Sequence, residues 1–339
     1  MRKLRVLILM HHDLVPPDDV HGLSDREYEQ IKCECDVIDA VQELGHDVLE
    51  LGLSDELAPL GKAIRDWKPQ IAFNLLEHFR GEVLYDQNVV SYLELLNVPY
   101  TGNNPRGLLI ARDKALTKKI AHYHRIPTAR FFAVPVGRRT RRPRRFTYPA
   151  IVKSQIEDAS TGIAQASVVN DDEALEERVR FVHENTQAPA IVEEFIDGRD
   201  LYASVVGNHR LRLLPIWEIT LDKLPPWSYR IASRRAKFNL EYQKQYGIRI
   251  RAARDLPDDL VRKIQRTSRR CYRILNLSGY ARLDFRLTKD GRLYLLEANP
   301  NPDISEDEEL ASAAGAAGIS YKNLIQKILN LGLRRNSSL

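Results

Sequence analysis

The stretch GYARLDFRLTKDGRLYLLEANPNPDIS, residues 279–305, decides the fold. Asp290–Gly291 separates two runs in which apolar and polar residues alternate, a pattern that predicts a β-hairpin with a two-residue turn. If those two residues form the turn, the register of the two strands follows from counting outward. The predicted pairs are Asp284 with Glu297 and Arg282 with Asn299.

These four polar side chains share one face of the hairpin, because residues two apart on a strand point the same way. Two carboxylates directly opposite each other repel, so a positive charge must lie near Asp284 and Glu297. Mg²⁺ prefers oxygen ligands and is often coordinated by one or two carboxylates together with substrate phosphates. A divalent cation is therefore the first hypothesis for this positive charge. The alternative is a solvated outer face with Arg282 as the counter-ion. The residues expected on the opposite face are Leu283, Phe285 and Leu296.

The composition is that of a folded protein of two or three domains. The chain has 339 residues, of which 43% are hydrophobic and 29% charged, which excludes wholesale disorder and a fibrous chain. No apolar run reaches the roughly 18–20 residues that cross a bilayer. The N-terminus MRKLRVLILMHHD begins like a signal peptide, but its apolar core is too short, so we expect a buried first strand. The three cysteines lack zinc-type spacing and are too few for a disulfide framework, which favours the reducing cytoplasm.

The first hundred residues alternate strands and helices. The apolar run 4–10 predicts a strand, and apolar residues three or four apart over 25–44 predict an amphipathic helix. Further strands are expected at 47–53 and 71–76, which together indicate a doubly wound α/β domain with a parallel sheet. Ligands bind at the carboxyl ends of such strands. The residues that this places at the mouth of a cleft are His11, His12 and Glu77.

The pattern changes near residue 103 to an α+β arrangement. Two short helices are expected next, with Asp113 as the N-cap of the second. Residues 222–255 look irregular. Extended segments are expected at 130–134, 149–154, 163–168, 190–196, 200–207 and 211–219, and helices at 171–183, 257–275, 306–317 and 320–332.

Two segments of this second part suggest nucleotide binding. Lys153 ends the strand PAIVK, and a polar loop follows that closes with Ser160, Thr161 and Gly162, small residues that let backbone N–H groups approach a phosphate. The alternative is an ordinary hairpin with a surface lysine. The strand AIVEEFIDGRD, 190–200, carries two acids that could accept hydrogen bonds from an adenine amino group or a ribose hydroxyl. The alternative there is the outward face of an edge strand.

The ordered set of motifs resembles the ATP-grasp superfamily, and within it the D-alanine–D-alanine ligase and its relatives. The motifs are DKALTK (113–118), PAIVK…STG (149–162), VEEFIDGRD (192–200), AKF (236–238) and RLDF…LLEANPNP (282–302). The resemblance implies a Rossmann-like domain over 1–103, followed by a two-part α+β ATP-grasp module with a central subdomain over 104–188 and a C-terminal subdomain over 189–339. It also implies cleavage of ATP to ADP and phosphate, with a carboxylate and an amine joined through an acyl phosphate.

Site roles carry over from this resemblance position by position. Lys114 and Lys153 would bind ATP phosphates beneath the loop 157–162, and Lys237 would reach the γ-phosphate. Glu193 would meet the adenine end, Phe195 and Ile196 would form the hinge, and Asp200 would take the ribose hydroxyls. Two Mg²⁺ ions, which Mn²⁺ could replace, would be held by Asp284, Glu297 and Asn299. Arg282 would stabilise the developing acyl phosphate.

Departures from the family bear on the substrate. The family's Glu, Ser and Tyr clasp is missing: Ala159 and Phe238 occupy two of the positions, and HHDLVPPDD, 11–19, lacks the glutamate. Asp303 replaces a glycine, and Glu308 replaces the serine that binds a substrate carboxylate. A carboxylate does not accept another carboxylate without a proton or cation between them. The acids of SEDEEL, 305–310, suit a cationic or amine-rich acceptor, unless they only cap the following helix.

The sequence therefore predicts an ATP-dependent carboxylate–amine ligase that acts on an amino acid or peptide other than two D-alanines. Two alternatives stay open: D-alanine–D-alanine ligase proper, and a catalytically silent nucleotide-binding protein. No membrane partner is expected, and relatives suggest a homodimer. The arginine cluster, residues 138–145, is either a solvated loop or a dock for an acidic partner. The net charge of +5 is too small to indicate nucleic acid by itself.

Overall fold

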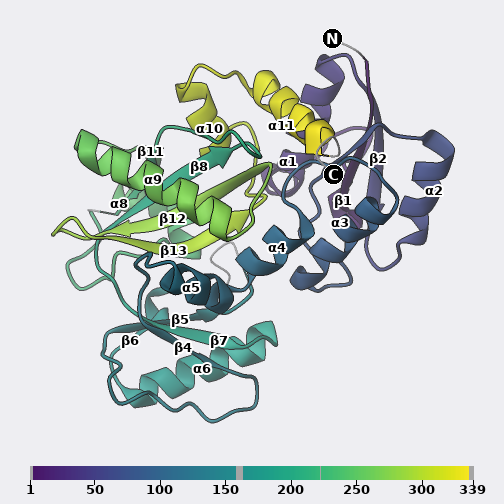
Figure 1. The fold of residues 1–339 in the computed structure, drawn as a ribbon. Coiled ribbons are helices and arrows are strands. Elements are labelled where there is room, and N and C mark those ends of the chain that lie inside the picture. The colour runs from purple at the N-terminus through teal and green to yellow at the C-terminus, as the bar shows by residue number, and fades with distance from the viewer. Residues whose placement is uncertain (1–2, 158–162, 222, 336–339) are drawn as a thin grey trace.

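Three sheets make up the core of the protein, as Figure 1 shows. The structure is a computed structural model that describes residues 3–157, 163–221 and 223–335. In that part of the chain, none of the helices is both long and apolar enough to pass through a bilayer.

The first sheet is parallel and covered on both faces, as the sequence predicts. Its strands β1 (Arg5–His11), β2 (Asp47–Leu53) and β3 (Ile71–Asn74) lie in the order β2-β1-β3. Successive residues of β1 point to opposite faces. Val6, Ile8 and Met10 pack against α1 (Asp25–Glu43) and α11 (Tyr321–Arg335). Leu7 and Leu9 pack against α2 (Ala58–Trp67) and α3 (Asp86–Leu95). The apolar start of the chain is therefore a buried strand.

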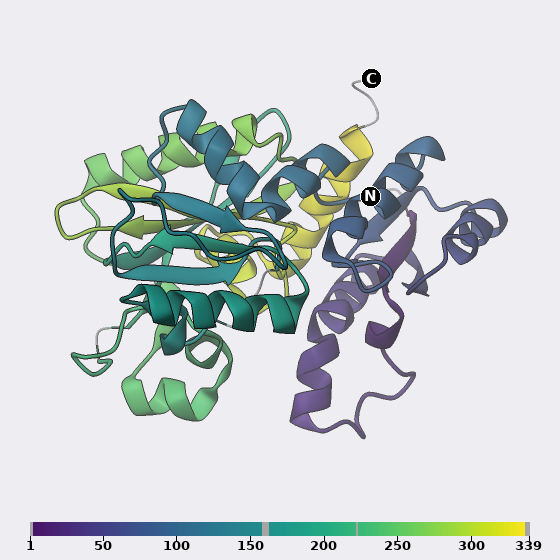
Figure 2. The same ribbon diagram turned by 90° about the horizontal axis from the view of Figure 1, so that it is seen from below.

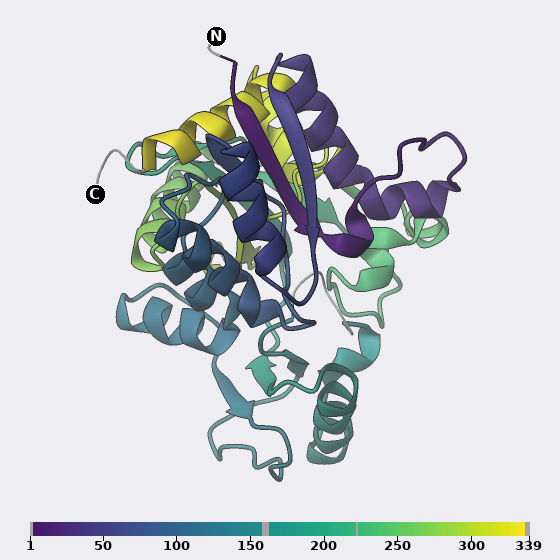
Figure 3. The same ribbon diagram turned by 90° about the vertical axis from the view of Figure 1, so that its right-hand side faces the viewer.

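The C-terminal helix α11 completes this first domain. Figure 3 shows α11 beside the first sheet, although some 250 residues of chain separate it from β3. Gly332 of α11 lies so close to the carbonyl of Tyr100 that a Cβ there would come within 2.5 Å of the oxygen. A helix is expected over 320–332, as part of the C-terminal subdomain, but its packing on the first domain is not expected from the sequence.

The middle sheet is antiparallel, in the order β4-β7-β5-β6. Figure 2 shows α6 (Asp172–Thr186) along one of its faces. The strands are β4 (Phe131–Val134), β5 (Ala150–Ser154), β6 (Val168–Val169) and β7 (Ala190–Glu194). Two expectations change here. The segment 163–168, expected as a strand, is mainly the 3-10 turn Gln165–Ser167. β7 pairs with β4 and β5, so this sheet extends beyond residue 188, where the central subdomain was expected to end.

The large sheet holds the predicted hairpin at one end, with β12 inside the sheet and β13 at its edge. Its strands run β11-β10-β8-β12-β13, and β9 (Arg212–Leu213) pairs with β8. The strands are β8 (Arg199–Val206), β10 (Trp217–Thr220), β11 (Arg249–Ala252), β12 (Tyr280–Leu287) and β13 (Leu293–Pro300). The helices around it are α4 (Pro105–Arg112), α5 (Lys114–Tyr123), α9 (Asp258–Ile274) and α10 (Glu309–Ala316).

Residues 222–255 are more regular than expected. They form α7 (Arg234–Phe238), α8 (Leu240–Tyr246) and β11, apart from residue 222, which lies outside the described residues. The single strand expected at 211–219 is divided into β9 and β10. Short basic segments of this kind lack a clear apolar period. Their order comes from tertiary packing, such as Ala236 of α7 against Tyr202 of β8.

The hairpin has the predicted register at its polar pairs, although it reaches that register differently. Asp284 pairs with Glu297 and Arg282 with Asn299. The turn has three residues rather than two, because the Thr288 N–H donates to the carbonyl of Arg292 at 2.9 Å. A β-bulge between Asp284 and Phe285 restores the register, since Phe285 pairs with Leu295 and leaves Leu296 as the extra residue. The prediction that Leu296 lies on the apolar face, opposite the polar pairs, is therefore wrong. Leu296 lines the cavity beside Glu297, and Leu295 lies in the core instead.

Gly332→Ala tests the close approach of α11 to the first domain. Crowding of a buried site costs about 1–3 kcal/mol, which exceeds the helix-propensity gain of about 1 kcal/mol, so we expect a lower free energy of unfolding. Gly315→Ala in α10 is the matched control, because nothing lies within 4 Å of its Cβ position, and it should be neutral or stabilising. Urea denaturation measures both. Equal stability of the two variants would contradict the packing described for α11.

Candidate active site

Five of the residues predicted from sequence meet in one cavity between the middle and large sheets. Each comes from a different element, namely β5, β8, α7, β12 or β13. The five are Lys153, Asp200, Lys237, Asp284 and Glu297. Two lysines facing three carboxylates is a charge pattern suited to a phosphate chain that is shared with a divalent cation.

A buried ion triad lies under one wall of this cavity. Glu193 of β7 is 1% exposed, with one carboxylate oxygen 3.1 Å from Lys118 Nζ and the other 3.4 Å from Lys153 Nζ. Burial alone would raise the pKa of Glu193, but the two ammonium groups lower it overall. Because β7 is an interior strand, the alternative of an outward-facing edge strand is wrong. Glu193 contacts lysines here, and its predicted role at the adenine end stays a prediction.

Lys118 is a site residue that the sequence reasoning missed. Its side chain is fully buried, and besides Glu193 it donates to the carbonyl of Leu296, the bulged residue, at 2.8 Å. Lys118 follows Lys114 by one helical turn of α5. Asp113 is the N-cap of this helix, as predicted, and its side chain accepts from the Leu116 N–H. The four-residue spacing places both lysines on one face of α5. That spacing could have identified Lys118.

The phosphate-loop predictions are only partly visible. Lys114 is buried, and its Nζ donates to the carbonyl of Glu157 at the start of the predicted loop. Lys153 is also buried, which excludes the alternative of a surface lysine. Ser160, Thr161 and Gly162 lie outside the described residues, as does Ala159.

The predicted hinge and ribose residues lie where β7 passes into β8. The Phe195 ring contacts that of Tyr229 with centroids 5.1 Å apart, and Ile196 follows in the link to β8. Asp200 of β8 is 4% exposed, and its Oδ1 lies 2.9 Å from Arg286 Nε. Burial raises the pKa of Asp200 although Arg286 opposes the shift. The Tyr202 hydroxyl beside it is buried without a hydrogen-bond partner among the described residues.

Arg282 is the central cation of the predicted metal end. Its Nε donates to Asp284 Oδ1 at 2.8 Å and its Nη2 to Oδ2 at 3.1 Å, a bidentate pair. Burial raises the pKa of Asp284 despite this pairing. Asp284 is buried, and Arg282, Glu297 and Asn299 are partly buried, so this is not a solvated outer face. The suggestion that Arg282 is the counter-ion of Asp284 is right.

The donor set fits a hard cation. Asp284 and Glu297 supply opposed carboxylate oxygens, and Asn299 supplies an amide oxygen on the same face. The Asn299 Nδ2 is buried and has no partner among the described residues. Oxygen ligands of this kind are the ones that Mg²⁺ and Mn²⁺ accept.

A second cavity of about 270 Å³ continues from this end and carries several acids. Arg282 Nη1 donates to Glu309 Oε2 at 3.0 Å. Burial and the neighbouring Glu309 raise the pKa of Glu308 to about 8. Burial would also raise the pKa of Glu309, but the contact with Arg282 outweighs it and lowers that pKa to about 2. Glu308 occupies the N-cap position of α10 without a capping hydrogen bond from its side chain, so helix capping does not account for it.

Of the other residues predicted near the substrate, only some line the cavities. Glu77 lines the cavities at the substrate end, whereas His11 and His12 are not among the residues described as lining them. His11, His12 and Asp13 instead lie close together at the end of β1. In the arginine cluster, Arg142 pairs with Asp172 at 2.7 Å and donates to the carbonyl of Phe146.

The fold and this arrangement of charges define an ATP-grasp ligase, an enzyme class that forms carbon–nitrogen bonds at the expense of ATP. The family profile described as "D-ala D-ala ligase C-terminus" matches residues 120–330. The D-alanine–D-alanine ligase of Aquifex aeolicus is 31% identical over 96% of this chain and all of its own length. The chain therefore belongs to the D-alanine–D-alanine ligase family.

Other comparisons agree with the fold. An uncharacterised protein of Sinorhizobium fredii is 29% identical over 88% of this chain and 87% of its own. The structure of D-alanine–D-alanine ligase from Bacillus anthracis complexed with ATP superimposes with a TM-score of 0.76 at 23% identity, covering 98% of this chain and 99% of that one. Family membership favours an enzyme over the silent binding protein considered above.

Lys118→Met tests the buried triad. Removal of one partner leaves the Glu193 carboxylate short of a counter-charge, and breaking a buried pair costs about 3–5 kcal/mol. Because Lys153 remains beside Glu193, we expect a loss near the lower end of that range in thermal or urea unfolding. Lys119→Met, on the exposed side of the same helix, is the control and should change stability by less than about 0.5 kcal/mol. Similar losses in both variants would contradict the triad.

Proposed function

We propose that the protein joins a carboxylate to an amine through an acyl phosphate, with ATP cleaved to ADP and phosphate, and that its substrates are an amino acid or peptide other than two D-alanines. The observation that carries the proposal is the meeting of Lys153, Lys237 and the opposed acids of the hairpin in one gap between two sheets. Fixed cations and metal-binding oxygens at that point are what phosphoryl transfer to a carboxylate requires.

The residues along the gap have different proposed roles in binding ATP and the metal ion. Lys153 and Lys237 would bind the phosphate chain of ATP, with Lys114 near the start of the loop that would close over it. Asp284, Glu297 and Asn299 would hold Mg²⁺ or Mn²⁺, which would neutralise phosphate charge when bound. Asp200 would bind the ribose, and Phe195 and Ile196 would border the adenine.

Two displacements complete the reaction. A substrate carboxylate oxygen attacks the γ-phosphorus, the bond to the β-phosphate oxygen breaks, and ADP leaves. The amine nitrogen then attacks the acyl carbon, the carbon–phosphate oxygen bond breaks, and the nitrogen gives up a proton. In the first step negative charge spreads over the phosphoryl oxygens and passes to the leaving ADP, and in the second step it gathers on the acyl oxygen. Arg282, held at that end by Asp284 and Glu309, would stabilise this charge.

D-alanine–D-alanine ligase activity is the second candidate, and the names of the curated relatives favour it. The acids at the substrate end favour the first candidate. Glu309 pairs with Arg282 in the second cavity, where it would repel an incoming carboxylate and compete with it for the guanidinium. An uncharged D-alanine methyl group makes no use of such acids.

Phosphate release with Mg-ATP over a panel of amino acids and dipeptides, in both enantiomers, separates the two candidates. We expect release with pairs other than two D-alanines and formation of an amide product detectable by mass spectrometry. Activity with two D-alanines and with no other pair would establish the second candidate instead.

Asp284→Asn tests the metal assignment. Loss of one carboxylate charge should weaken cation binding and lower turnover by at least about 100-fold. Asp290→Asn, at the exposed turn of the same hairpin, is the matched control and should retain full turnover. Circular dichroism would verify that both variants fold. Unchanged turnover in Asp284→Asn would remove the cation from this hairpin.

A further inference from the structure

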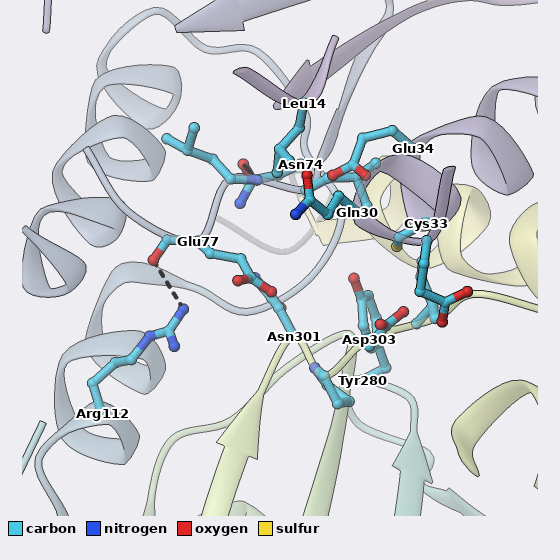
Figure 4. Close-up of a pocket in the computed structure, with 15 residues that line it drawn as sticks. Leu14, Gln30, Cys33, Glu34, Asn74, Glu77, Arg112, Tyr280, Asn301 and Asp303 are labelled. Carbon is cyan, nitrogen blue, oxygen red and sulfur yellow. Dashed lines mark hydrogen bonds between the residues drawn. The ribbon is translucent and has the colours of Figure 1, made fainter. Parts of the chain in front are cut away.

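A cavity of about 180 Å³ lies beside the substrate end of the gap (Figure 4). It is enclosed by α1, by the segment that follows β3, and by the loop between β13 and α10. Glu77, Arg112 and Asp303 line both this cavity and the one that contains Arg282, so the two spaces are adjoining parts of one substrate region. We name the 180 Å³ cavity the α1 pocket.

Acids predominate in the α1 pocket. Glu34 of α1 is 4% exposed, whereas Glu77 and Asp303, which also line the pocket, are exposed residues. Arg112 is the one cation among the described lining residues, and it pairs with Asp86 at 2.9 Å. Burial and the charges of Glu77 and Asp303 raise the pKa of Glu34 to about 7. The pocket therefore carries carboxyl groups that a ligand cation would stabilise in their ionised form.

A neutral polar group in the same wall indicates a second ligand contact. Asn74, at the end of β3, is 1% exposed and lines the pocket. Its Oδ1 accepts a hydrogen bond from the Leu76 N–H, and its Nδ2 is buried with no partner among the described residues. A buried amide donor without an acceptor is unfavourable, so a ligand oxygen at this point would relieve it. Figure 4 shows Asn74 and Glu34 on the same side of the pocket.

We propose that the α1 pocket binds the ammonium group of a basic substrate, an amino acid or short peptide that carries an amine besides the group that reacts. Glu34 and Asp303 supply the counter-charges, and the amide of Asn74 donates to a carbonyl or carboxylate oxygen of the same molecule. This specificity rests on the proposed ligase function, because it concerns the substrate of that reaction.

Paired ligands that differ only in charge test the proposal. Ornithine is compared with norleucine, and 2,4-diaminobutyrate with norvaline, each in both enantiomers, because each pair exchanges a terminal ammonium for a methyl group. Isothermal titration calorimetry on the full chain, with a non-hydrolysable ATP analogue present, measures binding without turnover. We expect at least tenfold tighter binding of one basic ligand than of its neutral partner. Equal affinity within every pair overturns the proposal.

Glu34→Gln assigns the preference to the pocket. We expect the preference to fall to about twofold or less, with nucleotide affinity unchanged. The parent should also release protons on binding near pH 7, since Glu34 becomes ionised beside the ammonium group, and the variant should not. Asp39→Asn, an exposed acid on the same helix, is the matched control and should keep the preference. A preference that survives both Glu34→Gln and Asp303→Asn overturns the proposal.

The two proposals fail in different ways. If the basic ligands bind with the expected dependence on Glu34 but no amine supports phosphate release, the ligase chemistry is wrong and the pocket assignment stands. If phosphate release and amide formation occur equally well with neutral pairs, and Glu34→Gln changes no affinity, the ligase chemistry stands and the pocket assignment is wrong.

Discussion

The opposition of Asp284 and Glu297 across the β12–β13 hairpin is the constraint on which the site depends. β12 lies inside the large sheet between β8 and β13, and its acid, Asp284, is only 4% exposed. Two opposed carboxylates, one buried and one partly buried, need positive charge, and Arg282 supplies part of it through its bidentate contact with Asp284. The remaining demand explains why lysines from two other elements converge on the same gap.

The sequence predicted this pairing correctly for a reason that was incomplete. Counting from a two-residue turn gave the right partners because a three-residue turn and the bulge at Leu296 shift the register in opposite directions. Alternation cannot reveal such a bulge, since Leu295 and Leu296 are the same residue type and either one satisfies the apolar face. The bulge also has a consequence of its own, because it presents the Leu296 carbonyl to Lys118.

Local sequence patterns predicted the helices and strands and most of the charged residues of the site. They did not predict the contacts between residues distant in sequence. The first sheet and its flanking helices follow from periodicity and buried apolar runs. The packing of α11 on the first domain and the short helices α7 and α8 depend on partners distant in sequence, and no window of residues contains them. Glu193 illustrates the difference: its position on a strand was predictable, but its two lysine partners come from α5 and β5.

Arg282 links the reactive end of the site to the choice of substrate. One guanidinium contacts both Asp284 in the gap and Glu309 in the adjoining cavity, so charge on either side alters how firmly it is held. An anionic substrate group would compete with Glu309 for Arg282 and weaken the network that positions it. A cationic group would instead supply the positive counter-charge that the acids lining the adjoining cavities need. The same electrostatic balance that prepares the site for phosphoryl transfer thus favours a substrate with an additional amine.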